Sequence, residues 1–230
     1  MCAVIGLFLR CIDQDLIKRV FHESSIRGLH ATGISYVKNN RIHTIKYSIP
    51  VSQFEPLNRI EEFVNEDGNL YMIGHCRYST SDIRYPQPMC DHTNSVFSDH
   101  SYSLVHNGVI SQELPQNWAK LYKVSTETTN DSELLFHRHD NVFEDWKGAS
   151  IAAIDLYKEK IIRFYRNGRR PLYYTETETG VIITSTKDII ERSKINGKTQ
   201  RTSPGIYYKL IDGKIIEHNS GVTVHELQYV

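Results

Sequence analysis

Apolar residues recur with two different periods along this chain, and these periods distinguish strands from helices. Residues 2–9 form a short, nearly continuous apolar run, which is typical of a strand buried on both faces. In residues 13–26 the apolar positions recur at helical spacing, as Leu16, Ile17, Val20 and Phe21. The chain is therefore expected to begin with a buried strand followed by an amphipathic helix.

Most of the remaining pattern is typical of antiparallel strands. Single strands are expected at 70–78 and 102–110, and an irregular stretch at 86–99. Hairpins are predicted at 34–47, 150–165, 172–184 and 206–217, turning at Asn39-Asn40, Lys158-Glu159, Thr179-Gly180 and Asp212-Gly213.

Short helices are predicted between these strands, at 56–64 and 186–193. Another helix is expected to begin at Asn130, because Glu133 three residues later resembles a capping box. Many antiparallel strands with few helices predict a single α+β domain, with two sheets covered by helices.

Composition excludes several classes of function. Lys+Arg and Asp+Glu are 27 each, so no net charge favours nonspecific binding to nucleic acid or to a membrane surface. No segment reaches the about 18–20 apolar residues that span a bilayer, and the opening apolar run lacks the features of a signal peptide. The 4 cysteines are sparse and the 11 histidines scattered. We therefore expect a cytoplasmic protein with neither a disulfide framework nor a metal site.

Cys2 is the first residue with distinctive chemistry. If Met1 is removed, the thiol and a free α-amine belong to one residue, and an α-amine has a pKa of about 7.7–8.0. Such a residue supplies a nucleophile and its own base. The alternative is that Cys2 is a small core residue of the first strand.

Two glycine-bearing segments each allow two interpretations. Residues 27–33 form a helix C-cap and turn, or a close backbone approach at a site. Asn107-Gly108 is a strong hairpin signal. It also offers an amide N–H₂ and an unshielded backbone N–H, the donors of an oxyanion hole.

Two charged segments are equally ambiguous when taken singly. Arg77 ends an expected strand, where it forms a structural salt bridge or binds a carboxylate in bidentate fashion. Asp131 lies in the first turn of an expected helix, where it stabilises the helix dipole or binds an ammonium group.

Taken together in order, these segments resemble a known family. The succession M-C-x-V-I-G, R-G-x-x-x-T-G, G-H-C-R-Y-S-T, H-N-G-V-I and N-D-S-E resembles the class II glutamine amidotransferases, whose glutaminase domains have an N-terminal nucleophile. G-H-C-R-Y-S-T with Gln87-Pro88 is most similar to the amidophosphoribosyltransferase form, and glucosamine-6-phosphate synthase is the other form. Residues 166–174, 183–187 and 203–205 fall where later landmarks of the family stand, so the resemblance spans nearly the whole chain.

The resemblance implies a four-layer α/β/β/α sandwich of the N-terminal-nucleophile hydrolase type and an activity without metal or organic cofactor. It also implies residue roles in the hydrolysis of L-glutamine through a thioester. Cys2 is the nucleophile, and Asn107 and Gly108 form the oxyanion hole. Arg77 binds the substrate carboxylate, Asp131 its ammonium, Thr80 lines the pocket and Arg27 orders the terminus.

Several features depart from the family pattern. His30 replaces a usual acidic residue, Tyr78 replaces a tryptophan of the synthase form, and Ser81 replaces a histidine. Residues 2–230 are expected to form one glutaminase domain without a synthetase domain, so a separate synthetase subunit is expected to take up the ammonia. Three alternatives remain open: a stand-alone glutaminase, another N-terminal-nucleophile amidase or acylase, and a non-catalytic regulatory module.

Overall fold

The structure is a computed structural model that describes residues 1–78 and 96–222, and it contains two antiparallel sheets. The strands of the first sheet are β1 (Ala3–Leu9), β2 (Ala31–Lys38), β3 (Arg41–Tyr47), β4 (Leu70–Arg77), β9 (Tyr173–Thr177), β10 (Gly180–Thr184) and β11 (Lys198–Arg201). They lie in the order β11-β9-β10-β1-β4-β2-β3, so β1 is central.

The second sheet carries the middle and the last part of the chain. Its strands are β5 (Phe97–Ser98), β6 (Tyr102–Val109), β7 (Ser150–Tyr157), β8 (Ile161–Arg166), β12 (Ile206–Ile211) and β13 (Lys214–Asn219). They lie in the order β13-β12-β8-β7-β6-β5.

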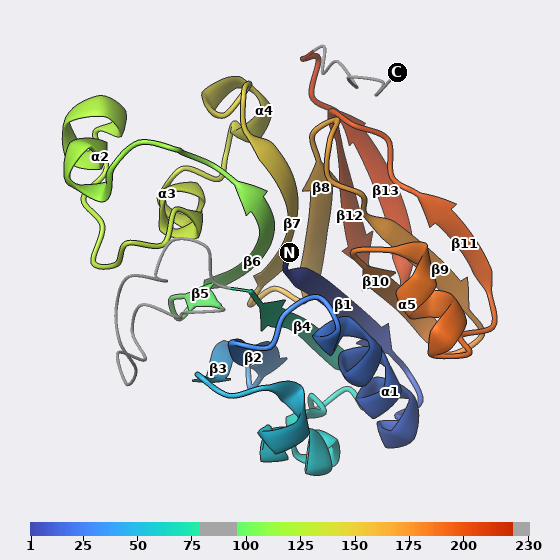
Figure 1. Ribbon diagram of the computed structural model, residues 1–230. Helices are drawn as coiled ribbons and strands as arrows, with labels where there is room; N and C mark the ends of the chain where they lie inside the picture. Colours follow the sequence, from blue (N-terminus) through green and yellow to red (C-terminus); the bar gives the residue numbers. More distant parts are fainter. Residues whose placement is uncertain (79–95, 223–230) are drawn as a thin grey trace.

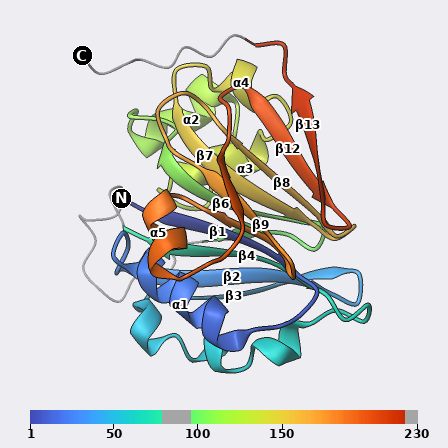
Figure 2. The ribbon, with the colours of Figure 1, turned by 90° about the vertical axis from the view of Figure 1, so that its right-hand side faces the viewer.

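Helices cover the outer face of each sheet. The first sheet packs against α1 (Gln14–Ser25), α5 (Lys187–Arg192) and the 3₁₀ turns η1 (Val51–Gln53), η2 (Glu55–Asn58) and η3 (Ile60–Phe63). The second packs against α2 (Pro115–Tyr122), α3 (Ser132–His137) and α4 (Val142–Asp145). Figures 1 and 2 show the resulting layers, which confirm the expected α/β/β/α sandwich.

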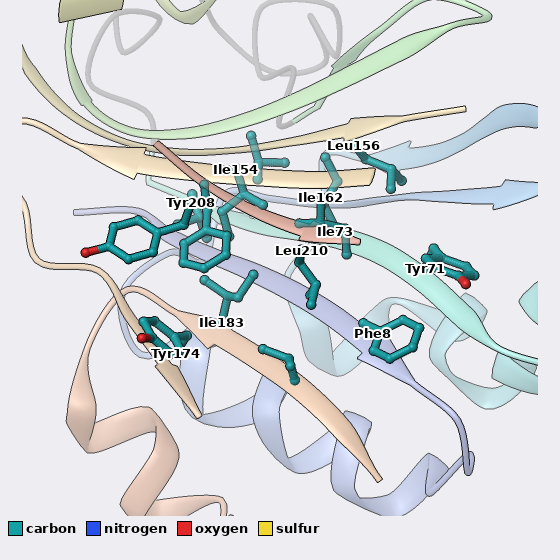
Figure 3. Close-up of a cluster of buried hydrophobic side chains, with 14 of the residues drawn as sticks. Phe8, Tyr71, Ile73, Ile154, Leu156, Ile162, Tyr174, Ile183, Tyr208 and Leu210 are labelled. Atoms are coloured by element: carbon teal, nitrogen blue, oxygen red, sulfur yellow. The ribbon is translucent and has the colours of Figure 1, made fainter. Parts of the chain in front are cut away.

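The central core lies between the two sheets (Figure 3). Phe8 and Ile183 contribute from the first sheet, and Ile154 and Leu156 from the second. Strand β1 is buried along its whole length because its two faces enter different cores. Val4 and Phe8 belong to the core between the sheets, whereas Ala3, Ile5, Leu7 and Leu9 belong to the core beneath the helices. This explains the continuous apolar run at the start of the sequence.

The predicted opening helix and the hairpins are confirmed. Asp13 caps α1 by accepting a hydrogen bond from the Leu16 N–H at 2.8 Å. Asn39 and Asn40 both have a left-handed backbone in the β2–β3 turn, as do Asp212 and Gly213 in the β12–β13 turn. Left-handed residues are what two-residue hairpins require.

The helix predicted at 56–64 is wrong in type, because this region consists of 3₁₀ turns. Its buried apolar residues recur every third position, as Val51, Phe54, Leu57, Ile60 and Phe63. Three residues per turn is the 3₁₀ period, and a helix of 3.6 residues per turn rotates the same positions off the buried face.

The helix expected from Asn130 begins later, at Ser132, and its capping box is not formed. The Glu133 carboxylate instead accepts hydrogen bonds from the N–H groups of Glu127 and Thr128 at 2.6 and 2.8 Å. It therefore anchors the preceding loop. The alternative turn at Asn107-Gly108 is also wrong, since both residues lie within β6 and pair with β7.

The sequence pattern did not predict the helices α2 and α4 or the strands β5 and β11. Strand β11 is the polar edge strand Lys-Thr-Gln-Arg, which pairs on one side with β9. Polar edge strands lack the alternation that marks half-buried strands. Within the two described ranges, no helix combines the length and apolarity needed to cross a membrane.

Candidate functional site

The strand register brings three of the expected site residues to one end of the space between the sheets. Ala3 pairs with Cys76, so Cys2 stands across from Arg77. Side chains alternate along strands, so Cys2 shares the inner face with Val4, and Arg77 shares it with Ile73. On β6, Asn107 likewise follows Val105, another residue of the core between the sheets. Strand β1 contacts β6 directly, so these positions converge from both sheets.

The Cys2 thiol contacts the backbone just beyond the end of β4. The N–H of Tyr78 donates to the Cys2 Sγ at 3.4 Å, and the thiol lies 3.5 Å from the Tyr78 carbonyl oxygen. Burial raises the pKa of Cys2 above its ordinary value, whereas the Tyr78 N–H and the Arg77 charge act in the opposite direction. The sulfur therefore lies in a site that is poor in water but contains groups that favour the thiolate.

Met1 is present in the structure and is held by two arginines. Its Sδ lies 3.6 Å from Nη2 of Arg27 and 3.3 Å from Nη1 of Arg170. Arg27 also donates from Nε to the Cys2 carbonyl oxygen at 3.1 Å. Arg27 thus contacts both residues of the terminus. Met1 is 62% exposed.

Asn107 presents a donor that has no acceptor within the described part of the chain. The residue is 1% exposed, and its Nδ2 lacks a hydrogen-bond partner there. Buried polar groups are nearly always satisfied, and an orphaned one requires an explanation. An oxyanion formed during a reaction is an acceptor of the required kind.

Gly108 is required by the close approach of β7. A Cβ at this position would lie 1.6 Å from the Ser150 carbonyl oxygen and 2.7 Å from Nε2 of His106. The residue also has a φ of +157°, which side chains disfavour. The glycine therefore reflects backbone packing within the sheet, in addition to any role of its N–H.

Asp131 is tied to the end of β6 and lies at the base of α3. Its Oδ2 accepts hydrogen bonds from the N–H of Ile110 at 2.6 Å and of Ser111 at 3.4 Å. Burial raises the pKa of Asp131, and these two N–H groups and the Arg77 charge oppose that shift. Although Asp131 stands at the N-cap of α3, its side chain makes no cap hydrogen bond to that helix.

Arg77 provides the positive charge of the site and is only 4% exposed. Burial raises the pKa of both Cys2 and Asp131, and the Arg77 charge opposes that rise in each case. Its guanidinium therefore lies near both groups. Opposite charges, Arg77 and Asp131, therefore both act on the thiol. Thr80 lies outside the described residues.

Two residues that contact the backbone around this site were not predicted from the sequence as functional positions. Ser185, which is fully buried, accepts a hydrogen bond from the Val4 N–H at 2.8 Å and so fixes the start of β1. Arg170 donates from Nε to the Ser150 Oγ at 3.0 Å and thus connects the terminus to the strand beneath Gly108. Both residues lie in landmark segments of the family, but only the strand register reveals what they contact.

His106 joins β6 to α3 as a neutral imidazole. Its Nδ1 lies 3.0 Å from the Ser132 Oγ, and burial is the main cause that lowers its pKa to about 3. Within the described residues, no three His, Cys, Asp or Glu side chains converge as a metal site would require.

Comparison with known proteins gives one curated relative and several similar structures. The glutamine–fructose-6-phosphate aminotransferase of Bartonella henselae is 27% identical over 147 residues, which are 60% of this chain and 21% of the relative. No family model matches the chain.

Among solved structures, the glutamine phosphoribosylpyrophosphate amidotransferase of B. subtilis superposes with a TM-score of 0.71 at 17% identity, covering 97% of this chain and 50% of that protein. A class II glutamine aminotransferase domain protein of Silicibacter pomeroyi gives a TM-score of 0.55 at 10% identity, covering 95% and 99%.

The chain thus spans about a fifth of the curated relative and half of the B. subtilis structure. The two antiparallel sheets and the similar structures show that the chain has the fold of these amidotransferase structures, which agrees with the expected sandwich. The chain is thus similar in sequence to a glutamine–fructose-6-phosphate aminotransferase and in fold to glutamine amidotransferase structures, which supports the resemblance that its ordered motifs indicated.

Proposed function

We propose that this chain hydrolyses the side-chain amide of L-glutamine, with Cys2 as the nucleophile after removal of Met1. The observation that carries the proposal is the convergence of Cys2, Arg77, Asp131 and the unpartnered amide of Asn107 at one end of the space between the sheets. Glutamine requires opposite charges for its α-carboxylate and α-ammonium, and Arg77 and Asp131 supply that pair.

The proposed reaction proceeds through a thioester. The free α-amine of Cys2 takes the thiol proton as the sulfur bonds to the amide carbon, which gives a tetrahedral oxyanion. The Asn107 N–H₂ and the Gly108 N–H stabilise that oxyanion. The C–N bond then breaks, and the nitrogen leaves as ammonia with the proton from the amine. Water attacks the thioester, releasing glutamate and restoring the thiol.

We further propose that the ammonia passes to a separate synthetase subunit. In this proposal residues 2–230 act as a single glutaminase domain, and Thr80 contributes to the glutamine pocket. The similarity to an aminotransferase and to a phosphoribosylpyrophosphate amidotransferase supports a use of glutamine nitrogen in synthesis. The proposed setting is the cytoplasm, where a reducing environment preserves the Cys2 thiol.

The test begins with a C-terminally tagged protein whose intact mass reports the loss of Met1. Glutamate and ammonia are then measured with glutamine as substrate, alone and with added hydroxylamine, which intercepts a thioester as a hydroxamate. We expect equal amounts of glutamate and ammonia, and hydroxamate formation that requires Cys2. The matched variants are Cys2→Ala and Cys11→Ala, because Cys11 is an exposed thiol outside the site.

Three outcomes would contradict the proposed reaction, and a fourth would contradict the synthetase partner. Retained Met1 removes the base, so the chain is then a non-catalytic module. Faster hydrolysis of simple acyl amides than of glutamine identifies an acylase. Full activity in Cys2→Ala rules out the mechanism. Hydrolysis that no synthetase accelerates or exploits identifies a stand-alone glutaminase.

A further inference from the structure

An aromatic stack lies directly beside the proposed nucleophile. The His30 ring lies against the Tyr78 ring with centroids 4.6 Å apart and planes inclined by 28°. The His30 N–H also donates to the Arg77 carbonyl oxygen at 2.9 Å. His30 therefore holds the segment at the end of β4 through both its backbone and its ring.

Tyr78 occupies a position that strand pairing does not fix. Strand β4 ends at Arg77, and β2 begins at Ala31, so His30 and Tyr78 both stand just outside the paired ladder. The Tyr78 ring is 43% exposed, and His30 supplies the aromatic partner that stacks on it within the described residues. The stack is thus a second contact, beside the hydrogen bond from the His30 N–H to the Arg77 carbonyl oxygen, that holds Tyr78 at the end of β4.

The same backbone segment contacts the sulfur. The Tyr78 N–H donates to the Cys2 Sγ at 3.4 Å. The charged groups that act on this sulfur are Arg77 of β4, the Met1 amine and Asp131 before α3. Arg27 also interacts with it electrostatically and donates to the Cys2 carbonyl oxygen. Among the groups that lower the pKa of Cys2, the Tyr78 N–H has a larger effect than the Arg77 charge.

We propose that His30 is a positioning residue, whose ring holds the Tyr78 N–H against the Cys2 sulfur and thereby stabilises the thiolate. The inference rests on the proposed function to the extent that Cys2 is the nucleophile. Hydrogen bonds to a charged sulfur are sensitive to distance and angle, so a small displacement of residue 78 weakens this one. The nitrogen atoms of the His30 ring have no part in the proposed role.

Alkylation of the thiol tests this without glutamine. Protein that intact mass shows to lack Met1 is treated with iodoacetamide at several pH values from about 6 to 9. The alkylation rate of each thiol follows its thiolate fraction. Peptide mass spectrometry measures Cys2 and Cys11 separately. Cys11 is an exposed thiol remote from the stack and serves as the internal reference. The variants are His30→Ala, which removes the ring, and His30→Phe, which keeps a ring without nitrogen atoms.

In His30→Ala we expect Cys2 to be alkylated about threefold more slowly below its midpoint pH, as partial loss of one hydrogen bond to a charged group predicts. His30→Phe is expected to match the wild type, and Cys11 is expected to react equally in all three proteins. An unchanged Cys2 profile in His30→Ala overturns the proposal, and so does a His30→Phe profile that matches His30→Ala.

The two hypotheses fail separately. If the alkylation profile shifts as described but glutamine is not hydrolysed, the proposed function fails and the role of His30 stands. If glutamine is hydrolysed but the profile does not shift, the role of His30 fails alone. Thermal unfolding of both variants detects a general loss of structure. Such a loss would not slow the alkylation of Cys2 alone.

Discussion

The carboxylate of Asp131 accepts a hydrogen bond from the backbone N–H of Ile110 at 2.6 Å. Ile110 follows directly on the strand that carries Asn107 and Gly108, so the proposed ammonium-binding group and the proposed oxyanion hole form one connected unit. His106 and Ser132 reinforce the connection through a contact of 3.0 Å. A change at Asp131 therefore affects both binding and the placement of the oxyanion donors.

Two substitutions at Asp131 separate its charge from its backbone contact. Asp131→Asn keeps an oxygen that accepts from Ile110 but loses the charge, so we expect KM for glutamine to rise about 10–100-fold with little change in stability. Asp131→Ala loses both, and the unsatisfied N–H groups are expected to lower the free energy of unfolding by about 1–3 kcal/mol. Steady-state kinetics and urea unfolding measure the two effects. Equal KM values in wild type and Asp131→Asn would exclude ammonium binding here.

The raised pKa of Asp131 predicts a pH dependence of glutamine binding. Burial favours the protonated carboxyl, which has no charge to attract the substrate ammonium. Affinity is therefore expected to fall as pH decreases through the raised pKa, beginning at a higher pH than an exposed aspartate would show. Calorimetry on Cys2→Ala isolates binding from the titration of the thiol. The additional substitution Asp131→Asn is expected to flatten the profile.

Asn107→Ala is expected to separate activity from stability. Its Nδ2 has no partner within the described residues, so the folded state loses little when that donor is removed. The oxyanion loses a donor, which predicts a fall in kcat of about 10²–10³-fold with KM nearly unchanged. Kinetics and thermal unfolding of the same preparation check both halves. A large loss of stability with kcat preserved would contradict the oxyanion role.

The sequence predicted most of the fold because its local signals agree with the tertiary structure. The β1 run, the α1 period and the hairpin turns are properties of neighbouring residues, and the resemblance to a known family supplied the four-layer arrangement. Asn107-Gly108 shows the limit of local signals. Its preference for a turn is overridden by pairing with Ala152 and Ile151, some 45 residues later by register.

The site itself was predicted residue by residue but not as a set of contacts. The roles of Cys2, Arg77 and Asp131 came from resemblance, and the register of β1 against β4 explains why the first two meet. No local pattern indicates that Ser185 accepts from Val4, because that contact joins strand ends far apart in the sequence. The short helix predicted at 56–64 lies where the structure has two 3₁₀ turns, and the three-residue spacing of apolar positions over 51–63 is the signal that distinguishes them.

Gly108→Ala is expected to disrupt the second sheet. The added Cβ would meet the Ser150 carbonyl oxygen at 1.6 Å, so β6 and β7 must separate locally. The predicted loss of unfolding free energy exceeds about 4 kcal/mol, a size reserved for severe core changes. Gly148→Ala is the matched control, because its Cβ meets nothing within 4 Å and its φ is not positive. Denaturant unfolding of the two variants compares them, and similar midpoints would contradict the packing argument.

Ser185 provides a test of how firmly the nucleophile's strand must be held. Its Oγ accepts from the Val4 N–H, two residues after Cys2, and both groups are buried. Ser185→Ala leaves that N–H unsatisfied, so we expect a loss of about 1–3 kcal/mol in the free energy of unfolding. We also expect a lower kcat, because the start of β1 gains freedom and Cys2 moves with it. Ser185→Thr keeps the hydroxyl and is expected to restore kcat more fully than stability, since its extra methyl group enters a filled core. Urea unfolding and steady-state kinetics on all three proteins measure this, and a Ser185→Ala enzyme with wild-type kcat would show that the hydrogen bond serves folding alone.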